Sequence, residues 1–387
     1  MNDTPTVFFN AMILREPYSG VEVTVHQTLR ALAEHGTMPI CACLPVTHRP
    51  VPPAARVRLL TSAFARNSRF LRILWEQTAL PVLLRRYRAP LLHAPAYVAP
   101  LLAPCPTLLT VHDLHVFTHP SFCGYGNRLH YRMLMPRSIR RAARIIAFSN
   151  HTRENICARF PEAASKITVI PPGISPDLKP CTDPVRLQSA KSRYGLAEKF
   201  LLFIGDLTRR KNIDGVMRAF AALHPKHPEL QLTLAGHCDA QMRRAIRQTA
   251  AELGTAAQTN LPGYIAPADL AEVYSLAAAL VFPSHDEGFG LPPLEAMACG
   301  CPAVCSEKPF AAMHGDAISA CDPDSPASIA AATEPLLENS ARREALVAAG
   351  LRRAADFSWQ AAVVATERIY RDILGQAGFL NQIQQKL

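Results

Sequence analysis

The stretch from Phe282 to Leu291 brings carboxylates and glycines together where a strand is expected to give way to a helix. The apolar run predicts a strand that ends at Phe282, and Pro292 suits the first turn of a helix. Backbone N–H groups would then converge beside the positive end of that helix, from Gly288, Phe289, Gly290 and Leu291. This arrangement attracts an anion, and the glycines allow a phosphate or a sugar to approach closely.

Two glutamates flank this turn. Glu287 lies in the loop and Glu295 lies about one turn into the helix, with seven residues between them. One carboxylate could face the reacting end of a ligand while the other reaches its opposite end. Acidic residues near a helix N-terminus also suit the helix dipole, and for Glu295 alone that interpretation competes. It does not explain the whole string, because two glycines and two carboxylates in one turn have no packing purpose.

A second segment, which starts at Gly205, repeats the strand–loop–helix pattern with cations in the loop. Arg209, Arg210 and Lys211 precede a helix whose N-cap is predicted to be Asn212. Three cations beside a helix N-terminus are electrostatically unfavourable unless an anion lies there. The planar fork of Arg and the point charge of Lys both suit a diphosphate. A solvated basic loop is a reasonable alternative for Arg209 and a weaker one for Lys211.

The elements that must position these loops alternate between short apolar strands and amphipathic helices. The predicted strands are Thr6–Phe9, Ile40–Leu44, Leu108–Val111, Arg144–Phe148, Thr168–Ile170, Phe200–Ile204, Gln231–Ala235, Ala279–Phe282 and Ala303–Cys305. Nearly continuous apolar strands favour parallel sheets that are covered on both faces, in an α/β architecture. A stretch rich in proline at 171–184 separates two such series. The sequence therefore predicts two doubly wound, Rossmann-like domains, with ligands at the carboxyl ends of strands and in the interdomain cleft.

Composition excludes several classes of protein. With 49% hydrophobic and 19% charged residues, the chain is neither largely disordered nor collagenous nor a coiled coil. No apolar run reaches the ~18 residues that a membrane-spanning helix needs, and no signal peptide is expected. Eleven cysteines without metal-ligand spacing predict reduced, mostly buried thiols in a cytoplasmic protein.

Positive charge is concentrated in the first half of the chain. Residues 1–180 contain 21 Lys and Arg against 9 Asp and Glu, whereas the remainder is close to neutral. The asymmetry suggests an anionic partner for that half. Basic residues beside aromatics, from Arg66 to Trp75 and again at Arg85, Arg86 and Arg88, suit an anionic membrane surface. A solvated basic face explains the same residues equally well.

The two charged loops together resemble the signatures of a large family of retaining GT-B glycosyltransferases, the family 4 type. That family includes bacterial mannosyl- and rhamnosyltransferases and phosphatidylinositol mannosyltransferase. Glu287 and Glu295 match its Glu-x7-Glu motif around a Gly-Phe-Gly-Leu centre, and Gly205 with Lys211 matches its Gly-x5-Lys phosphate motif. Many members carry Arg directly after that glycine. Asp206 stands there in this chain, so the resemblance makes Arg210 the second phosphate ligand.

The resemblance extends over nearly the whole chain. It implies an acceptor-binding domain over residues 1–180, a nucleotide-sugar-binding domain over 181–370, and a C-terminal helix within 359–387 that crosses back to the first domain. Trp75-Glu76-Gln77 also occurs in several members that assemble polysaccharides. Further matches are a glycine loop at Ser19-Gly20, a histidine near the transferred sugar at His112, and nucleoside-holding turns at Gly236, Tyr264 and Ile265.

The activity that the resemblance implies is metal-independent transfer of a hexose, with retention, from a nucleotide-diphosphate sugar. Arg210 and Lys211 would stabilise the charge that develops on the leaving diphosphate. Glu287 would bind hydroxyls of the donor sugar, Glu295 would bind the ribose, and His112 would position the transferred sugar. Neither a cofactor nor a metal is expected.

GDP-mannose is the favoured donor from the resemblance alone, and a GDP- or dTDP-deoxyhexose or a UDP-hexose stays open. The acceptor would be a glycan or a polyprenyl- or lipid-linked sugar, and no nucleic acid is expected as a partner. Such an enzyme would serve surface polysaccharide or lipopolysaccharide assembly in a bacterium. It would lie in the cytoplasm or at the inner face of the cytoplasmic membrane.

Other functions compete for the same features. A sugar-nucleotide 2-epimerase would share the two-domain architecture, but the chain offers no acid–base set for it, and that class lacks the Glu-x7-Glu string. A sugar-nucleotide-binding module would bind without turnover. Asp322-Pro323-Asp324 is a literal Asp-x-Asp metal motif, yet Ser325-Pro326 after it predicts a helix start instead. The spacing of His112, His115 and His119 is poor for a metal, so one functional and two ordinary histidines are expected.

Overall fold

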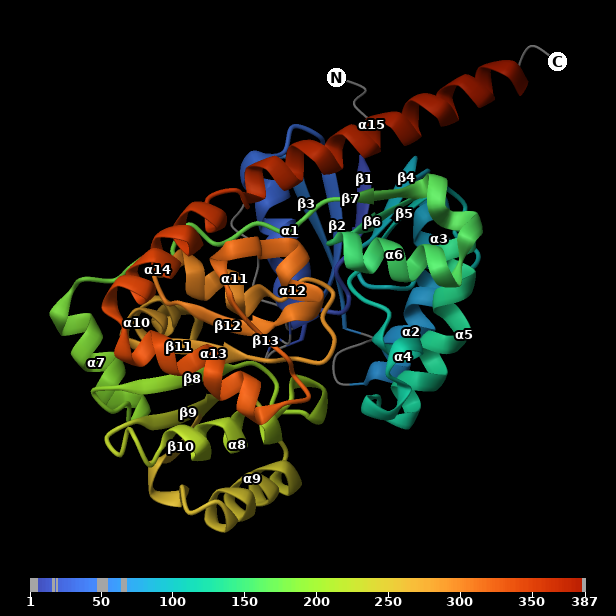
Figure 1. The fold of residues 1–387 in the computed structure, drawn as a ribbon. Helices are drawn as coiled ribbons and strands as arrows, with labels where there is room; N and C mark the ends of the chain where they lie inside the picture. Colours follow the sequence, from blue (N-terminus) through green and yellow to red (C-terminus); the bar gives the residue numbers. More distant parts are fainter. Residues whose placement is uncertain (1–5, 16–17, 19, 47–54, 64–67, 385–387) are drawn as a thin grey trace. The chain divides into compact units, whose positions relative to one another are not determined.

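The computed structural model describes residues 6–15, 18, 20–46, 55–63 and 68–384; Phe122, Tyr125, Asn127 and residues 377–384 are described by their backbone alone. The chain forms two units (Figure 1). The first unit contains Met1–Gly173 and Ser358–Leu387, and the second contains Ile174–Phe357. The first unit therefore ends before residue 180, where the sequence placed the boundary, and it takes in the C-terminal residues.

The first unit is built on a parallel sheet with the strand order β3-β2-β1-β4-β5-β6-β7. Its strands are β1 (Val7–Asn10), β2 (Ile40–Pro45), β3 (Val57–Ser62), β4 (Leu91–Ala94), β5 (Thr107–Val111), β6 (Arg144–Ala147) and β7 (Ile167–Val169). Every residue of β1, β2, β4 and β5 is buried, as expected of strands that helices cover on both faces. The helices are α1 (Gly20–His35), α2 (Arg69–Gln77), α3 (Ala79–Arg86), α4 (His115–Thr118), α5 (Tyr125–Arg141), α6 (Asn150–Arg159) and α15 (Trp359–Gln384).

The second unit has its own parallel sheet, in the order β10-β9-β8-β11-β12-β13. Its strands are β8 (Phe200–Ile204), β9 (Gln231–Ala235), β10 (Thr259–Gly263), β11 (Ala279–Phe282), β12 (Ala303–Ser306) and β13 (Ser319–Cys321). Its helices are α7 (Pro184–Tyr194), α8 (Ile213–Leu223), α9 (Ala240–Glu252), α10 (Leu270–Leu276), α11 (Leu291–Ala298), α12 (Glu307–His314), α13 (Pro326–Glu338) and α14 (Ser340–Ala354). No helix in the described part of the chain is both long enough and apolar enough to cross a membrane.

Strand order reverses at one point in each sheet, and this decides where a ligand can bind. In the second unit the chain runs outward from β8 through β9 to β10, then returns to the other side of β8 with β11. The loops after β8 and β11 therefore leave the sheet in opposite directions and open a crevice between them. The same reversal occurs between β1 and β4 in the first unit.

A buried carboxylate helps to hold the C-terminal helix α15 against the rest of the first unit. Glu367 accepts hydrogen bonds from the backbone N–H groups of Thr37 (2.6 Å) and Met38 (2.9 Å), and from the Thr37 hydroxyl (2.6 Å). Gly36 precedes this turn, and a Cβ there would come within 2.9 Å of the Glu367 carboxylate. These contacts hold α15 against the connection from α1 to β2.

The Trp75-Glu76-Gln77 segment has a structural role in the first unit. Trp75 is buried in the core, so it does not lie on the basic surface with which the sequence grouped it. Buried Glu76 accepts hydrogen bonds from the Asn10 amide at the end of β1 (3.2 Å) and from Arg72 (3.2 Å). Gln77 bonds the backbone after β4, at Ala99 and Leu101. The three residues thus join α2 to the sheet.

Candidate functional site

The two charged loops predicted from the sequence meet at the crevice of the second unit. β8 pairs directly with β11, so the loop that carries Arg210 and Lys211 lies beside the loop that carries Glu287. The backbone N–H of His285 donates to the carbonyl of Arg210 at 3.1 Å, which joins the loops through their main chains. The carboxyl ends of two adjacent strands therefore supply one site.

A buried ion-pair cluster forms the centre of this site. Lys211 donates a short hydrogen bond from Nζ to Glu287 Oε1, and the Arg210 guanidinium donates to the same oxygen at 3.0 Å and to the Asp286 carbonyl at 2.7 Å. The Ser284 hydroxyl donates to Glu287 Oε1 at 2.7 Å. Glu287 is 8% exposed and Lys211 is 9% exposed. Burying such charges is costly, which makes a structural purpose alone a poor explanation.

The electrostatics of the cluster keep Glu287 ionised. Burial raises the pKa of the Glu287 carboxyl, but the charges of Lys211 and Arg210 and the hydrogen bonds from Lys211 and Ser284 outweigh burial, so the pKa lies below its ordinary value. Burial also lowers the pKa of the Lys211 ammonium, and the attraction of Glu287 opposes that shift. The site thus holds an anionic carboxylate beside two cationic side chains.

All the hydrogen bonds that Glu287 accepts from described residues meet at one carboxylate oxygen. Lys211, Arg210 and Ser284 each donate to Oε1, and none of these described groups donates to Oε2. Ser284 is itself held in place, because the Ser306 hydroxyl at the end of β12 donates to the Ser284 carbonyl at 2.6 Å. The carboxylate is therefore oriented by one oxygen and keeps acceptor capacity at the other.

Glycines bring the neighbouring loops close together at the edge of this site. Gly236 follows β9 with φ +136°, and a Cβ there would lie 1.8 Å from the Gly205 carbonyl oxygen after β8. Its N–H donates to the Gly263 carbonyl at the end of β10 at 2.7 Å. The predicted Gly236, Tyr264 and Ile265 thus lie beside the Gly205 loop; Ile265 is buried and Tyr264 is half exposed.

The Gly288–Leu291 turn leads into α11 as predicted. Gly290 is the N-cap with φ +80°, and a Cβ there would come within 2.3 Å of the Phe310 ring. Phe289 is buried against Phe357, with ring centroids 5.5 Å apart, which anchors the turn. Gly288 and Leu291 flank these two residues, and Leu291 begins the helix. The helix N-terminus is therefore presented at the same sheet edge as Lys211.

Glu295 lies in α11, and a buried tyrosine holds it. The Tyr274 hydroxyl on α10 donates to Glu295 Oε2 at 2.9 Å. Burial raises the pKa of the Glu295 carboxyl, and the hydrogen bond from Tyr274 only partly offsets that shift. The two glutamates of the Glu-x7-Glu string thus have opposite pKa shifts, since Glu287 has cationic partners and Glu295 has a neutral one.

The first unit carries the other predicted site residues. His112 follows β5 and is buried; its Nε2–H donates to the Pro95 carbonyl at 2.7 Å, and its own carbonyl accepts from the Thr152 hydroxyl at 3.2 Å. Burial lowers the pKa of the His112 imidazole, although the Pro95 carbonyl and the charge of Asp113 oppose that shift. His112 is therefore a neutral, oriented imidazole.

A small pocket in the first unit connects His112 with α1. It has room for about one water molecule, and its lining includes Thr24, His93, Thr110, His112, Phe148 and Trp359. Gly20 is the exposed first residue of α1, and its carbonyl accepts from the Thr24 hydroxyl at 2.8 Å. Ser19, its partner in the predicted glycine loop, lies outside the described residues.

The sequence analysis considered two groups of residues as metal motifs, Asp322-Pro323-Asp324 and the three histidines His112, His115 and His119. Ser325 caps α13 by accepting from the Ser328 N–H at 3.2 Å, so Asp322-Pro323-Asp324 precedes a helix start. His112, His115 and His119 are not among the described residues that could share a metal ion. Sequence reasoning did not single out Ser284, Tyr274 or Thr152. Ser284 lies inside the recognised loop, whereas Tyr274 contacts Glu295, and Thr152 contacts His112, from helices that carry no motif.

Comparison with known proteins resolves the family. Residues 186–353 match the model for glycosyl transferases group 1, and residues 18–178 match the model for glycosyltransferase family 4. The chain belongs to the GT-B glycosyltransferases of the family 4 type. The resemblance predicted from the two charged loops is thereby confirmed.

Several known proteins are similar to this glycosyltransferase in sequence or in fold. An O-antigen chain mannosyltransferase B of Escherichia coli is 29% identical over 294 residues, which cover 74% of this chain and 76% of that protein. Sucrose-phosphate synthase from Thermosynechococcus elongatus has a TM-score of 0.77 at 22% identity, covering 96% of this chain and 100% of that chain. WaaG, a glycosyltransferase involved in lipopolysaccharide biosynthesis, has a TM-score of 0.71 at 16% identity, over 94% of this chain and 99% of that chain. The two structural matches confirm the predicted GT-B fold.

Proposed function

We propose that the chain transfers a hexose, with retention and without a divalent metal, from a nucleotide-diphosphate sugar to a glycan or lipid-linked acceptor. The observation that carries the proposal is the buried cluster of Lys211, Arg210 and Glu287 at the strand reversal of the second unit. Two cations beside a helix N-terminus are suited to a diphosphate. A carboxylate held between them is suited to the hydroxyls of the attached sugar.

The cluster has a clear division of labour in this proposal. Lys211, Arg210 and the N-terminus of α11 stabilise the negative charge that builds up on the leaving diphosphate. These groups supply the positive charge that a divalent cation supplies in other transferases. Glu287 keeps its Oε2 for sugar hydroxyls while Oε1 holds the cations in place. Glu295 accepts the ribose hydroxyls at the far end of the donor.

The reaction breaks the bond between the sugar C1 and the phosphate oxygen and forms a bond between C1 and the acceptor oxygen on the same face. The acceptor hydroxyl loses its proton to the leaving phosphate oxygen, so no protein base is needed. In this proposal His112 orients the transferred sugar, and its carbonyl, which accepts a hydrogen bond from the Thr152 hydroxyl, stabilises the positive charge that develops at C1. Because the pKa of His112 is lowered, this imidazole stays neutral and adds no opposing charge.

The choice of substrates rests on the relatives. The E. coli relative is an O-antigen chain mannosyltransferase, which favours GDP-mannose as the donor and a surface polysaccharide as the product. WaaG is involved in lipopolysaccharide biosynthesis, which points to the same class of acceptor. A GDP- or dTDP-deoxyhexose and a UDP-hexose are the other donors to test.

The experiment is a thermal-stability screen with GDP, UDP, dTDP and their sugars, followed by a transfer assay with the best donor. A ligand that binds the folded chain raises its melting temperature by mass action. We expect one base to raise it clearly, with chelator present, and Lys211→Ala to remove the rise. Arg209→Ala is the matched control, since Arg209 lies in the same loop and is exposed. An equal response of wild type and Lys211→Ala would contradict the proposal.

An anionic membrane surface is the proposed location for the acceptor. Helices α2, α3 and α5 of the first unit expose large apolar side chains, with Phe70 73%, Val82 61% and Met133 51% exposed. Arg85 and Arg86 in the last turn of α3 are exposed beside Val82. Exposed apolar side chains next to cations suit an anionic lipid surface.

Vesicle flotation tests this location. We expect the wild-type chain to float with phosphatidylglycerol-containing vesicles but not with neutral ones, and the double variant F70S/V82S to lose flotation. Val185→Ser is the matched control, because Val185 is 75% exposed in the second unit. Flotation that is equal on both vesicle types, or is unchanged in the double variant, would contradict membrane docking by this surface.

A further inference from the structure

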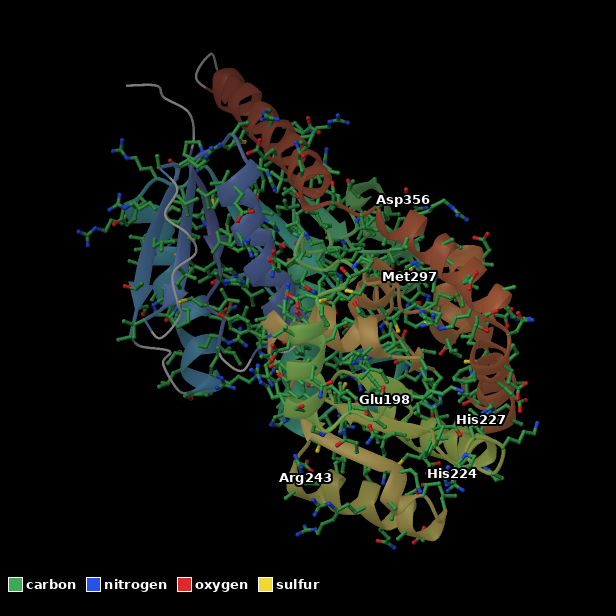
Figure 2. All side chains as sticks on the ribbon, turned by 90° about the vertical axis from the view of Figure 1, so that its left-hand side faces the viewer. Glu198, His224, His227, Arg243, Met297 and Asp356 are labelled. Carbon is green, nitrogen blue, oxygen red and sulfur yellow. The ribbon has the colours of Figure 1, made fainter. Side chains whose placement is uncertain are left out.

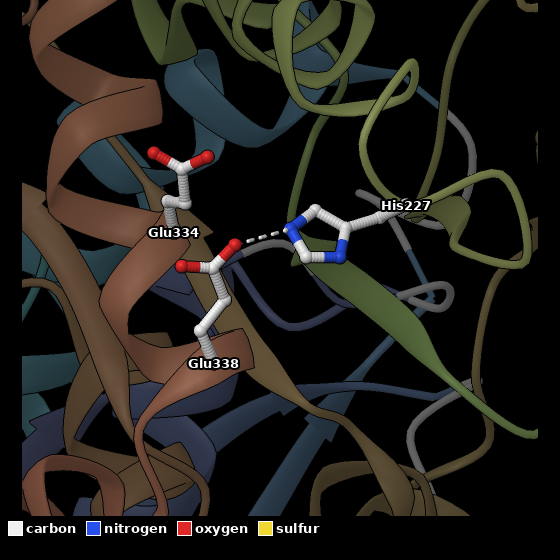
Figure 3. A group of neighbouring side chains, drawn as sticks. All are labelled: His227, Glu334 and Glu338. Carbon is white, nitrogen blue, oxygen red and sulfur yellow. Dashed lines mark ion pairs between the residues drawn. The ribbon is translucent and has the colours of Figure 1, made fainter.

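A second group of polar side chains lies in the second unit, at the end of α8 opposite to Lys211. His227 belongs to the turn that connects α8 to β9, and Glu334 and Glu338 lie in the last turns of α13 (Figure 3). One nitrogen of His227 and one oxygen from each glutamate all lie within 4.8 Å of one another. No other described group of His, Cys, Asp and Glu side chains meets this criterion.

The histidine is buried, unsatisfied and aimed at the carboxylates. His227 is 8% exposed, and its Nε2 has no hydrogen-bond partner among the described residues. Nε2 forms an ion-pair contact with Glu338 Oε1 at 3.5 Å, which Figure 3 marks with a dashed line. The backbone of His227 is fixed within the turn. Its main-chain N–H donates to the Leu223 carbonyl at 3.1 Å, and its carbonyl accepts from the Leu230 N–H at 3.0 Å. A buried ring nitrogen without a hydrogen bond is costly unless something binds it.

The positions of the Glu334 and Glu338 carboxylates are electrostatically unfavourable for α13 itself. Glu334 and Glu338 are four residues apart, so their side chains share one face of α13. They lie at its C-terminal end, where the helix carries partial negative charge and where α13 has no basic residue. Lys226 pairs with Glu334 at 2.6 Å, but its side chain is 65% exposed and can turn away to solvent. A cation at this point would offset both the carboxylates and the helix end.

We propose that His227, Glu334 and Glu338 form a binding site for a divalent first-row cation such as Zn²⁺. One imidazole nitrogen and two carboxylate oxygens suit such an ion better than Mg²⁺ or Ca²⁺, which prefer oxygen ligands alone. The ligand atoms of a tetrahedral zinc site lie about 3.4 Å from one another. Rotation of the two glutamate side chains would bring the present ligand atoms, which lie within 4.8 Å of one another, to that spacing. Water takes the fourth position. Glu338 is 53% exposed on its side chain, so this rotation meets little resistance.

The site lies away from the proposed donor site. The two are at opposite ends of α8, a helix of 11 residues, which corresponds to about 16 Å. His227 also precedes β9, whereas the Lys211 cluster lies at the carboxyl ends of the strands. Figure 2 shows His227 far from Met297 of α11. The bound ion would therefore tie α13 to the α8–β9 turn and take no part in transfer.

Zn²⁺ titration by calorimetry of the full chain, stripped with chelator, tests the proposal. We expect one Zn²⁺ per chain. The variants His227→Gln and Glu338→Gln should each weaken binding by about tenfold or more. The matched controls His224→Gln, in the same turn, and Glu344→Gln, an exposed carboxylate on α14, should bind as wild type does. Glu338 is a half-exposed surface residue, so its variant is expected to fold.

Co²⁺ substitution separates this site from cysteine. The chain has eleven free thiols, which bind Zn²⁺ well. Co²⁺ at the proposed site should give visible bands without a thiolate-to-metal charge-transfer band, and His227→Gln should abolish those bands. The proposal is overturned if His227→Gln and Glu338→Gln bind Zn²⁺ like wild type, if binding does not saturate, or if the Co²⁺ spectrum shows thiolate ligands. The side chains would then form ion pairs only.

Discussion

The two sheets of this glycosyltransferase have the same plan, but the side chains buried beside them differ in charge. Each is a parallel sheet whose strand order reverses once. At the reversal of the second sheet, Lys211, Arg210 and Glu287 are buried as charged groups. Next to the reversal of the first sheet, His93 and His112 are buried as neutral groups, with the pKa of His93 lowered to about 3 by burial.

The difference indicates which unit handles the charged part of the substrate. A neutral polar relay runs through the first unit, since His93 bonds the Tyr370 hydroxyl at 2.7 Å and the Thr110 hydroxyl at 2.9 Å. Such a relay orients groups without attracting an ion. The second unit concentrates fixed charge, which a diphosphate can use. The same backbone plan therefore supports orientation by neutral groups in the first unit and binding of an anion in the second. The side chains at the strand ends make the difference.

The largest effect is expected from removing charge in the second unit. Lys211→Ala should lower the transfer rate by about 10²–10³-fold, because charge stabilisation of the leaving group is lost. Glu287→Ala should lower it by a similar factor, because the donor-sugar hydroxyls lose the carboxylate that binds them and Lys211 and Arg210 lose their shared partner. Initial rates are measured after melting curves establish that each variant is folded. Arg209→Ala should keep nearly full activity. Full rates in both site variants would remove the distinction between the two sheets.

A stability cycle asks whether the buried pair in the second unit is mutually dependent. Glu287→Gln leaves Lys211 buried and unpaired, so the free energy of unfolding should fall by about 3–5 kcal/mol. Lys211→Met is the second single variant. The double variant K211M/E287Q should lose clearly less free energy of unfolding than Lys211→Met and Glu287→Gln lose together. Urea unfolding measures both. The exposed pair Asp214–Arg218 is the control, where Asp214→Asn should have little effect. Additive losses in the cycle would mean that the charges do not interact.

The neutral site of the first unit should contribute less to catalysis. His112→Ala should lower kcat by about 10–100-fold with little change in the donor KM, because the sugar is positioned less well. Thr152→Val should have a smaller effect of the same kind, since it frees the His112 carbonyl. Steady-state kinetics with the best donor separate kcat from KM. A large rise in the donor KM with unchanged kcat would place His112 in donor binding instead.

The last prediction is a pH dependence of stability to which the buried His93 of the first unit contributes. Because the pKa of His93 is about 3 in the folded chain and 6.5 in its ordinary state, the unfolded chain binds the extra proton as the pH falls below 6.5. The part of the stability that comes from His93 should therefore be fully present above pH 6.5 and decline by about 1.4 kcal/mol per pH unit down to about pH 3. Unfolding curves at several pH values should show a shallower slope in His93→Gln. His35→Gln, at an exposed position, should keep the wild-type slope, and an unchanged slope in His93→Gln would refute this source.

Much of the fold could be read from local sequence, and the exceptions have physical reasons. All the predicted strands are present, and all of them except the edge strand β7 are short apolar runs whose residues are mostly buried. The strands that the sequence did not reveal lack that signal. β3 has no buried residue, β10 contains Pro262 and polar residues, β4 lies between Pro90 and Pro95, and β13 has three residues. Their pairing partners rather than their composition make them strands.

The candidate site was predicted in its parts rather than in its contacts. The glycine turn, the Asn212 N-cap and the Glu-x7-Glu spacing are local, so the sequence carries them. The pairing of Lys211 with Glu287 spans 76 residues and follows only from β8 lying next to β11. The Tyr274 hydrogen bond to Glu295 is similarly non-local. The cation site at His227 was not predicted, because its glutamates lie more than a hundred residues from the histidine.

The most direct test of the account is a crystal structure with the nucleoside diphosphate that stabilises the chain most. The account predicts that the terminal phosphate lies about 3 Å from Lys211 Nζ and from the Arg210 guanidinium, above the N-terminus of α11. Glu287 should then face the side from which a sugar would extend. A diphosphate bound elsewhere, with Lys211 and Arg210 still paired only to Glu287, would contradict the account.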